Sequence, residues 1–553
     1  MSNHSSTSPG FDAAGSVFEL VQQAMTAYAD RPAFSCLGQT LTFKEIEQQS
    51  RALSGYLQHN TNLVPGDRIA IQLPNIIQFP VAAYAALSAG LVIVNTNPLY
   101  TTREMAHQFR DAGVKGIIAF SEVVPKLAQV MQSDDAGCVI ETVIVTRADD
   151  LLTGEQAISE LLAPELAESF SPGVSLTSFN AAIGAGQAQD ARLVKPKGME
   201  ALALLQYTGG TTGLSKGAML SHGNLVANVR QTHEKFAGVQ QPGEDIYICP
   251  LPLYHIYAFM VNLLLAAAQG AHNVLIPNPR DLDAFVGAIK PYAFTCFTGI
   301  NTLFVGLCHH QGFKQLDFSR LKLTISGGSA LTLNAANLWH RLTGCTISEG
   351  YGLSETSPVL CFNTPGNEKL GTIGWPLIDT EIEIWDEDNR ALSRGETGEI
   401  VARGPQVMSG YWQQPQASEQ ALVNGFFKTG DIGLIHQDGR VQIIDRKKDM
   451  ILVSGFNVYP NEVEGVLALH PKVLESAVVG HADESSGEKV CAYIVLEEGV
   501  PGDSDNAEYL IAEEVTAYCR SQLSAYKVPK EYHFVGELPK STVGKILRRE
   551  LRR

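Results

Sequence analysis

Short apolar runs alternate with longer helix-like segments from Ser16 to about Ala201. Arg68–Leu73 (RIAIQL) is typical of a buried strand, Pro80–Leu91 of the helix after it, and Val92–Val94 of the next short strand. A second run of the same kind follows Leu202. Strands and helices that alternate in this way predict α/β layers built on a mostly parallel sheet.

Later stretches of the chain show other residue patterns. Glu168–Pro196 carries Gly and Ser with weak periodicity, which predicts an irregular loop. Near Gly395 the chain changes to short strands and turns, with the sequences GEIVARG, GRVQIID and MILVSG. Beyond Arg446 the residues predict the order β–β–α–β–β–α–β, with Pro460 near the first turn of the first helix.

These patterns divide the chain into three parts. Residues 1–15 are rich in Ser and Asn, and we expect them to be disordered. We expect residues 16–445 to form a large N-terminal domain of layered α/β sheets with a β-rich subdomain. Residues 446–553 are expected to form a small α+β C-terminal domain, with the boundary close to Asp445–Lys448.

Composition excludes several classes of protein. The chain has 41 Lys and Arg against 58 Asp and Glu, a net charge of −17 that argues against general nucleic-acid binding. Its 9 cysteines show no metal-type spacing and suit free thiols in a reducing cytosol. The polar start does not resemble a signal peptide. No apolar stretch reaches the ~18–20 residues of a transmembrane helix, so any membrane contact should be peripheral.

The densest chemical signal is the segment Tyr207–Ala218 (YTGGTTGLSKGA). Glycines let a backbone approach phosphate closely, amides and hydroxyls donate hydrogen bonds, and Lys216 adds positive charge. The segment is not a Walker A loop, because Gly217 stands where the hydroxyl after the lysine would be. It predicts a flexible clamp on ATP phosphates, made by Tyr207, Thr208, Gly209, Gly210, Thr211, Thr212, Gly213 and Lys216.

Five further stretches fit the same scheme. They are SGGSAL (Ser326–Leu331), GYGLSETSP (Gly350–Pro358), KTGD (Lys428–Asp431), DRKKD (Asp445–Asp449) and PKSTVGKILRREL (Pro539–Leu551). Together with YTGGTTGLSKG they resemble, in order and spacing, the motifs of the adenylate-forming superfamily, which includes acyl-CoA synthetases, luciferases and peptide-synthetase adenylation domains. The resemblance runs from about Phe18 to the end of the chain.

Within that superfamily, four stretches look like the bacterial long-chain fatty-acid–CoA ligases that feed β-oxidation. They are Asn97–Glu104, Pro252–Phe259, Thr298–Phe304 and Asn424–Glu464. Two departures are Phe426, where the fatty-acyl pattern usually has Trp, and Ser354, where many members have Thr. These departures bear on the preferred chain length and leave the reaction type unchanged.

The resemblance implies a two-step reaction with Mg²⁺ as cofactor and ATP and coenzyme A as co-substrates. A fatty acid is first activated to an acyl-adenylate, and the acyl group then passes to the coenzyme A thiol. Alternatives are a ligase for medium-chain or other acids, or a fatty-acyl-AMP ligase serving a carrier protein. A nonenzymatic binding scaffold and a P-loop phosphohydrolase are the rivals from other classes.

The same resemblance assigns nucleotide-binding roles. Tyr351 resembles the aromatic residue that stacks on adenine, Glu355 the Mg²⁺ ligand, and Asp431 the acceptor of the ribose hydroxyls, with Arg446 beside it. The structural alternatives for these four residues are, in the same order, a core tyrosine, a solvated glutamate, a turn-forming aspartate and a hinge salt bridge. The neighbouring residues expected to line the nucleotide are Gly328, Ser329, Gly350, Gly352 and Ser354.

The resemblance also assigns the reacting groups. Lys545 matches the lysine that neutralises the charge of the adenylation transition state. His255 matches a residue beside the reacting carboxylate, in a positioning role rather than as a base. Phe259, four residues further on, matches the aromatic gate of an acyl tunnel. Plain core packing is the alternative for both His255 and Phe259.

Similar enzymes rotate the C-terminal domain between the two steps. Lys448 matches their hinge residue, and the turn Ser454–Gly455 matches the segment that then contacts coenzyme A. We expect a cytoplasmic monomer or homodimer that binds no nucleic acid. Peripheral contact with the inner face of the cell membrane is left open.

Overall fold

The computed structural model describes residues 14–132, 137, 139–153, 162, 164–170, 173–208, 215–497, 500, 505–541 and 544–552. Most of the stretch expected to be disordered, residues 1–13, lies outside this set. Ala14 is described and is buried against the core, so the expectation of disorder is wrong at that position.

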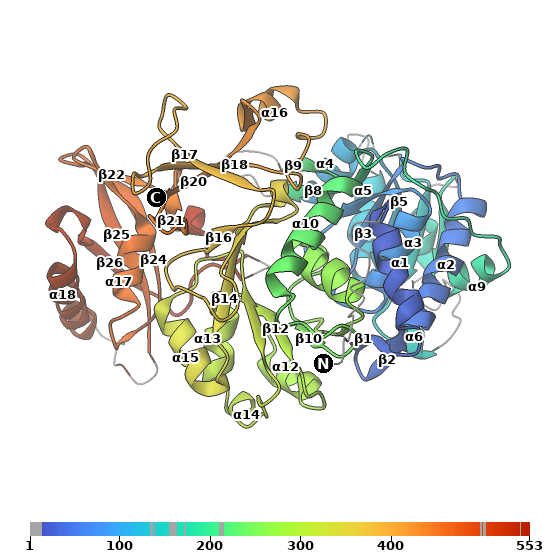
Figure 1. Ribbon diagram of the computed structural model, residues 1–553, viewed down its shortest axis with the longest axis horizontal. Helices are drawn as coiled ribbons and strands as arrows, with labels where there is room; N and C mark the ends of the chain where they lie inside the picture. The colour runs from blue at the N-terminus through green and yellow to red at the C-terminus, as the bar shows by residue number, and fades with distance from the viewer. Residues whose placement is uncertain are drawn as a thin grey trace, which may run out of the picture.

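Two large, mostly parallel sheets lie in the middle and at the right of the molecule in Figure 1. The nine-stranded sheet has the order β16 (Trp375–Pro376), β15 (Val359–Phe362), β14 (Ile347–Gly352), β13 (Leu323–Ser326), β12 (Cys296–Gly299), β10 (Ile246–Cys249), β11 (His272–Leu275), β1 (Pro32–Cys36) and β2 (Gln39–Thr42). The seven-stranded sheet has the order β7 (Ser175–Ser178), β6 (Thr142–Thr146), β5 (Val114–Phe120), β3 (Arg68–Gln72), β4 (Val92–Asn95), β8 (Leu202–Thr208) and β9 (Lys216–Ser221).

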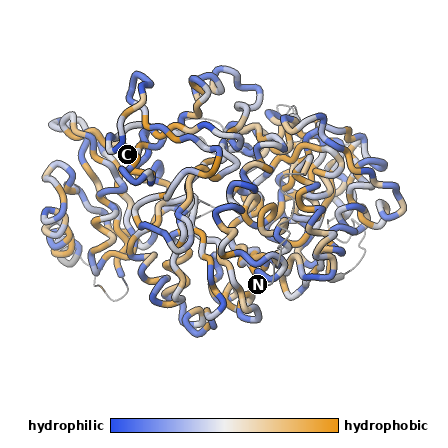
Figure 2. Tube along the Cα trace, in the orientation of Figure 1, coloured by the Kyte–Doolittle hydropathy of each residue, from blue (hydrophilic) through white to orange (hydrophobic). Residues whose placement is uncertain are grey.

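One continuous cluster of buried side chains joins the inner faces of the two sheets. Its helices are α1 (Val17–Ala27), α2 (Phe43–His59), α3 (Gln78–Ser88), α10 (His222–Phe236) and a π-helix over Phe259–Ala266. The outer faces are covered by α4 (Thr102–Ala112), α5 (Val124–Gln132), α12 (Leu282–Ile289), α13 (Asn301–His309) and α15 (Leu333–Thr343). Hydrophobic residues accordingly concentrate along the strands and the helix faces between them (Figure 2).

A third, antiparallel sheet forms the β-rich part predicted near Gly395. Its strands are β17 (Glu381–Trp385), β18 (Gly398–Arg403), β19 (Leu422–Val423), β20 (Phe426–Ile435) and β21 (Val441–Arg446). Short helices elsewhere are α6 (Asp150–Thr153), α8 (Pro164–Glu168), α11 (Ile256–Ala258), α14 (Gln311–Lys314) and α16 (Pro415–Ala421).

The C-terminal part has its own sheet and core, at the left of Figure 1. Its elements are β22 (Ile451–Val453), β23 (Phe456–Val458), α17 (Pro460–Leu467), β24 (Val473–Asp483), β25 (Gly487–Leu496), α18 (Asp505–Gln522) and β26 (Glu531–Phe534). The predicted order β–β–α–β–β–α–β is confirmed, and Pro460 is the first residue of α17. The fold class expected from the alternation is likewise confirmed.

The segment Glu168–Pro196 was predicted to carry an irregular loop, and the residues after Gln187 are irregular. The prediction missed strand β7 and helix α9 (Phe179–Gln187), which lie in the same segment. The side chain of Ser178 accepts a hydrogen bond from the amide of Ala181, which caps the helix. A Cβ added at Gly186 would lie 1.8 Å from the carbonyl oxygen of Ala52 in α2. The glycine thus permits close helix packing.

Among the described residues, the eight cysteines are all buried and free of disulfide bonds. No described helix combines the length and the apolarity that crossing a bilayer requires.

Candidate active site

Several of the predicted site residues follow the carboxyl ends of neighbouring parallel strands. Strands β10, β12, β13 and β14 run parallel, so their carboxyl ends meet at one edge of the nine-stranded sheet. His255 follows β10, Gly328 and Ser329 follow β13, and Tyr351 lies near the end of β14. Ligands of open α/β sheets bind outside this edge.

The C-terminal tail brings Lys545 to this edge. A Cβ added at Gly328 would lie 3.4 Å from Cε and 3.8 Å from Nζ of Lys545. The preceding Gly544 accepts a hydrogen bond at its carbonyl from Thr302 Oγ1, at 3.3 Å. Arg280 Nη2 donates to the carbonyl of Ser541 at 3.4 Å. The tail is therefore docked on the N-terminal part of the chain through both backbone and side chain.

Charge and burial tune the two groups closest to the expected reaction. Removal from water, and then the charge of Arg446, lower the pKa of Lys545 to about 8. Burial, with the charge of Lys545 as a second cause, lowers the pKa of His255 to about 3. The imidazole is therefore neutral, and its Nδ1 accepts the amide N–H of Tyr257 at 3.4 Å. The neutral tautomer then carries its proton on Nε2, as a hydrogen-bond donor.

Asp431 and Arg446 are brought together by strand register. They are partners in the antiparallel pair of β20 and β21, and Arg446 Nε lies 3.1 Å from Asp431 Oδ1. Tyr351 donates its hydroxyl proton to Asp431 Oδ2 at 2.6 Å. Three residues predicted to contact the nucleotide thus form one connected group, although they come from two sheets.

Glu355 is buried in a 3₁₀ turn over Ser354–Thr356, and burial raises its pKa. Its Oε1 accepts a hydrogen bond from the hydroxyl of Tyr411 at 2.8 Å. The Lys216 ammonium lies 5.2 Å from the centre of the same tyrosine ring, a cation–π contact. Tyr411 therefore connects the lysine of the predicted phosphate clamp with the predicted Mg²⁺ ligand.

The predicted phosphate clamp includes the end of β8 and the start of β9. Thr208 and Lys216 are partners in the antiparallel pair of these two strands. Tyr207 is buried and donates its hydroxyl proton to Asp111 at 2.6 Å, so its side chain supports this strand pair. The remaining predicted clamp residues lie outside the described part of the chain: Gly209, Gly210, Thr211, Thr212 and Gly213.

Packing of the strands alone requires glycine at positions 350 and 352. An added Cβ at Gly350 would lie 2.7 Å from the ring of Phe362, and one at Gly352 would lie 1.7 Å from the carbonyl oxygen of Pro358. Both glycines therefore let β14 approach β15, whatever else they contact.

Phe259 is fully buried and begins the π-helix. π-Helical turns are uncommon overall, but those that occur are often found at functional sites.

Lys448 lies in the turn between β21 and β22, where removal from water lowers its pKa to about 8. Ser454 and Gly455 form the turn between β22 and β23, with φ of 50° and 82°, and both are exposed. In this arrangement, the predicted coenzyme A turn is thus on the surface.

Two polar groups of the site were missed by sequence reasoning. Glu349 precedes the GYG motif, and its Oε1 accepts the amide of Leu331 at 3.1 Å, which ties together two predicted motifs. Burial raises the pKa of Glu349 to about 7. The other is Tyr411, which lies 56 residues from Glu355 and carries no motif that would have marked it.

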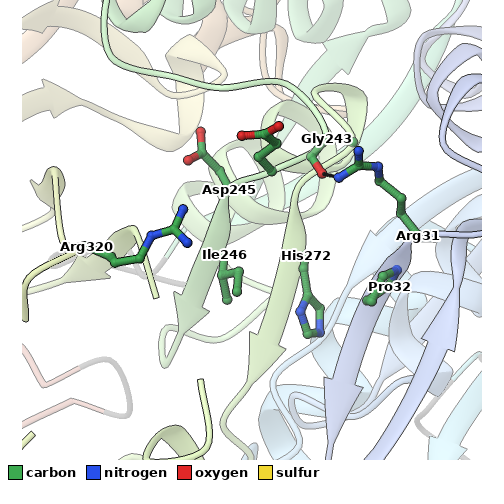
Figure 3. Close-up of a pocket in the computed structure, with 9 residues that line it drawn as sticks. Arg31, Pro32, Gly243, Asp245, Ile246, His272 and Arg320 are labelled. Carbon is green, nitrogen blue, oxygen red and sulfur yellow. Dashed lines mark hydrogen bonds between the residues drawn. The ribbon is translucent and has the colours of Figure 1, made fainter. Parts of the chain in front are cut away.

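A separate pocket of about 340 Å³ lies at the opposite end of the parallel strands (Figure 3). Ile246 and His272, the first residues of β10 and β11, line it. Arg31 Nη1 donates to the carbonyl of Gly243 at 2.5 Å, and Asp245 pairs with Lys322 at 2.7 Å. These charges support the chain around the pocket, and none of the predicted site residues lines it.

Comparison with known proteins gives two family matches. The AMP-binding enzyme model matches residues 21–412, and the AMP-binding enzyme C-terminal domain model matches residues 462–545. A long-chain-fatty-acid–CoA ligase of Yersinia pestis is 43% identical over 547 residues, covering 98% of this chain and 94% of that relative. One of Bacillus subtilis is 35% identical over 538 residues, covering 96% and 93%.

Among solved structures, the ATP-bound form of MatB from Rhodopseudomonas palustris has a TM-score of 0.82 at 27% identity, covering 97% of this chain and 98% of that one. The apo form of the same protein has a TM-score of 0.72 at equal identity and coverage. The arrangement of the present chain is therefore nearer to that of the ATP-bound form.

Proposed function

Because the chain belongs to the AMP-binding enzyme family, we propose that it converts a long-chain fatty acid, ATP and coenzyme A into fatty acyl-CoA, AMP and pyrophosphate. The observation that supports this most is the docking of Lys545 beside Gly328, where its ammonium is electrostatically coupled to Arg446, Asp431 and Glu355. Groups from the middle of the chain and from its C-terminal tail thereby converge on one region.

The first half-reaction joins two anions. A carboxylate oxygen of the fatty acid forms a bond to the α-phosphorus of ATP, and the bond to pyrophosphate breaks. Like charges repel, so the site has to neutralise both reactants and the additional charge of the transition state. Lys545 supplies a positive charge for this purpose, and the neutral His255 offers an Nε2–H donor that orients the carboxylate without acting as a base.

The nucleotide is held by residues of both lobes in this proposal. Tyr351 stacks on adenine against Gly328 and Ser329, while Asp431 accepts the ribose hydroxyls beside Arg446. The clamp from Thr208 to Lys216 covers the phosphates. Gly350, Gly352 and Ser354 shape the adenine side, and Phe259 gates the acyl chain.

The residues present fit a Mg²⁺ ion bound with the nucleotide. Glu355 is a buried carboxylate that the structure pairs with the hydroxyl of Tyr411, and a single carboxylate plus substrate phosphates is how Mg²⁺ is commonly held. Such an ion would supply Lewis-acid charge to the phosphate oxygens. Glu355 is the residue that we propose to hold it.

In the second half-reaction, the coenzyme A sulfur attacks the acyl carbonyl, AMP leaves, and the thiol proton passes to solvent. The ordinary thiol pKa of ~8.5 leaves a small thiolate fraction at neutral pH. Because Lys545 lies beside Gly328 in the present arrangement, we propose that the C-terminal domain, over residues 446–553, rotates about Lys448. Rotation would withdraw Lys545 and bring in the exposed turn of Ser454 and Gly455.

A Lys545→Ala variant tests this scheme. We expect it to lose ATP–pyrophosphate exchange by at least ~100-fold, because an oriented charge on the transition state is removed. Formation of acyl-CoA from supplied acyl-AMP should remain within about threefold of the parent enzyme, since that step does not need the lysine. Equal loss of both activities would contradict the two-arrangement scheme.

The substrate is tested with a panel of acids from acetate to oleate. Coenzyme A-dependent release of AMP should be fastest with acids of long chain length. Faster turnover of a medium-chain or aromatic acid would favour the alternative ligases. Adenylate formation without transfer to free coenzyme A would favour a ligase that serves a carrier protein.

The cellular setting is part of the same proposal. Transfer of a long-chain fatty acid from water into lipid is favourable by about 0.8 kcal/mol per CH₂. The acid therefore accumulates in membranes, where an enzyme that uses it would bind it. We propose a cytoplasmic enzyme, monomeric or homodimeric, that contacts the inner face of the cell membrane peripherally. Co-sedimentation with lipid vesicles would test the contact, and light scattering would give the oligomeric state.

A further inference from the structure

The sheet of the C-terminal domain carries metal-ligating side chains that the proposed reaction does not use. His481 lies on β24, and Glu531 and His533 lie on β26, with β25 between these strands. The register pairs Cys491 of β25 with Glu531, and Tyr493 with His533. Paired residues project to the same face of a sheet, so the three strands present one polar group together.

The ligand atoms of this group lie close to one another. One from each of His481, Glu531 and His533 lies within 4.8 Å of the others. His533 Nε2 is 2.8 Å from Glu531 Oε1, and His481 Nδ1 is 3.7 Å from Glu531 Oε2. Zn²⁺ bonds of about 2.0–2.2 Å separate two ligands of one ion by roughly 3–4 Å. Small rotamer adjustments would therefore bring all three atoms around one ion.

The backbone selects the tautomer of His481 that a metal needs. Its Nε2 lies 3.1 Å from the carbonyl oxygen of Leu551. A carbonyl oxygen only accepts, so Nε2 carries the proton, and in the neutral imidazole Nδ1 presents a lone pair towards Glu531. Two acceptors then face each other, an arrangement that a cation between them would stabilise. A second hydrogen bond that orients the ring is also the usual support of a metal-bound histidine.

In the present structure, Lys489 places a positive charge beside Glu531. Its Nζ lies 2.8 Å from Glu531 Oε2. The lysine side chain is about one-third exposed, at 31%, so it can move to solvent if another cation takes its place. Lys489 and a metal ion would thus compete for the same carboxylate.

We propose that His481, Glu531 and His533 form a binding site for a divalent transition-metal ion, with Zn²⁺ as the occupant that their chemistry favours. Imidazole and carboxylate together suit Zn²⁺, whereas Mg²⁺ prefers oxygen ligands alone. The thiol of Cys491 donates to Glu531 Oε2 at 3.4 Å, so it contacts the carboxylate of the proposed site.

The site is connected to the tail that carries Lys545. The carbonyl of Leu551 accepts hydrogen bonds from His481 and, at 3.1 Å, from the hydroxyl of Tyr493. Leu551 also packs against the apolar cluster on this face of the sheet. An ion that fixes His481 would therefore hold residues 544–552 in place more firmly.

Metal titration of the full chain, stripped with a chelator and free of nucleotide, tests the proposal. Zn²⁺ affinity is measured by competition with a chromogenic chelator, and Co²⁺ by its visible absorption. We expect one site that excess Mg²⁺ does not displace. His533→Asn should weaken Zn²⁺ binding by on the order of 100-fold, because it removes one ligand on an accessible edge of the cluster. Zinc should also slow amide hydrogen exchange in residues 544–552.

Two further variants sharpen the result. His309→Ala removes an exposed histidine of the N-terminal domain and should leave Zn²⁺ affinity unchanged. Lys489→Gln should tighten Zn²⁺ binding by about tenfold, because it removes the competing cation. Equal Zn²⁺ binding by the parent protein and His533→Asn would overturn the proposal, as would a Lys489→Gln variant that binds no more tightly than the parent.

Discussion

At the scale of single residues, the site combines charges that burial makes costly. Lys545 lies near two other cations, Arg446 and Lys448, and both lower its pKa, while Asp431 and Glu355 raise it. With nucleotide absent, the resulting pKa of about 8 is close to neutral pH. The ammonium is thus easily lost in alkaline solution unless an anion binds beside it.

This pKa makes adenylation sensitive to alkaline pH. Lys545 is charged below its pKa and neutral above it, so kcat/KM for ATP in pyrophosphate exchange should fall as pH rises through about 8. In Lys545→Arg the fall should move above pH 10, because arginine stays protonated, although the rate is reduced by about tenfold through altered geometry. Lys540→Arg, in the same tail but paired with Glu475, is the control and should keep the parent profile.

Tyr411 is expected to set the affinity of the proposed Mg²⁺ site. Tyr411→Phe removes the 2.8 Å hydrogen bond to Glu355, a bond that lowers the pKa of this buried carboxyl. The Mg²⁺ concentration for half-maximal adenylation should rise by about tenfold, as is usual when the support of a ligand is lost. Tyr509→Phe removes a similar 2.9 Å bond to Glu513 on the exposed side of α18, and it should leave the Mg²⁺ requirement unchanged. An unchanged Mg²⁺ requirement in Tyr411→Phe would be evidence that Glu355 does not bind the metal ion.

At the scale of elements, Arg548 connects the tail to both sides of the turn that we propose as the hinge. Its guanidinium forms two bonds to Glu464 in α17, at 3.0 and 2.6 Å, and lies 3.6 Å from Asp449. On the other side of the turn it lies 3.9 Å from the buried Asp445. Rotation about Lys448 would change the contact with Asp445, whereas the pair with Glu464 lies within the C-terminal domain.

Loss of Arg548 should therefore destabilise the C-terminal domain. Arg548→Leu leaves Glu464 and Asp449 without their largely buried partner, at a cost of about 3 kcal/mol of unfolding free energy. Denaturant unfolding followed by an optical probe of this domain would measure the loss. Arg549→Leu changes an exposed neighbour, and its unfolding midpoint should stay at that of the parent. Equal midpoints for the two variants would rule out the ion cluster as a support of this domain.

The elements that the sequence predicted correctly have strong local signals. Strands β3 and β4 contain the short apolar runs Ile69–Ile71 and Val92–Val94, and Pro460 marks the start of α17 because proline is favoured in a first helical turn. Helix α9 was missed because its two glycines are typical of a loop. The reason for Gly186 is contact with α2, which is distant in sequence and therefore invisible to a local pattern.

The same distinction between local signals and distant contacts applies to the candidate site. Motif residues such as Asp431 and Arg446 were identified, yet their pairing follows from the register of β20 and β21, which only the fold supplies. Glu349 and Tyr411 carry no motif, and their roles arise from contacts made across the molecule. Sequence reasoning therefore found the groups that resemble a known family and missed the groups that hold them.

At the scale of the whole molecule, the proposed two-step reaction requires a second arrangement besides the one in the structure. Lys545 is docked at the carboxyl edge of the nine-stranded sheet, while Gly455 and its neighbours are exposed on the C-terminal domain. Leu452 and Phe456, which flank the turn on β22 and β23, are also 48% and 58% exposed. Apolar residues around a strained turn are better explained by a second arrangement in which they are covered.

A Gly455→Ala substitution should distinguish the two arrangements. In the present structure an added Cβ meets nothing within 4 Å, so adenylation should stay within about twofold of the parent despite the strain at a φ of +82°. Acyl transfer to coenzyme A should fall by at least ~10-fold, because the turn would then lie against another part of the protein and the substrate. Gly366→Ala has the same open surroundings at a φ of +81°, and it should affect neither step. Parallel loss of both activities in Gly455→Ala, measured by pyrophosphate exchange and by transfer from supplied acyl-AMP, would mean that strain alone explains the effect.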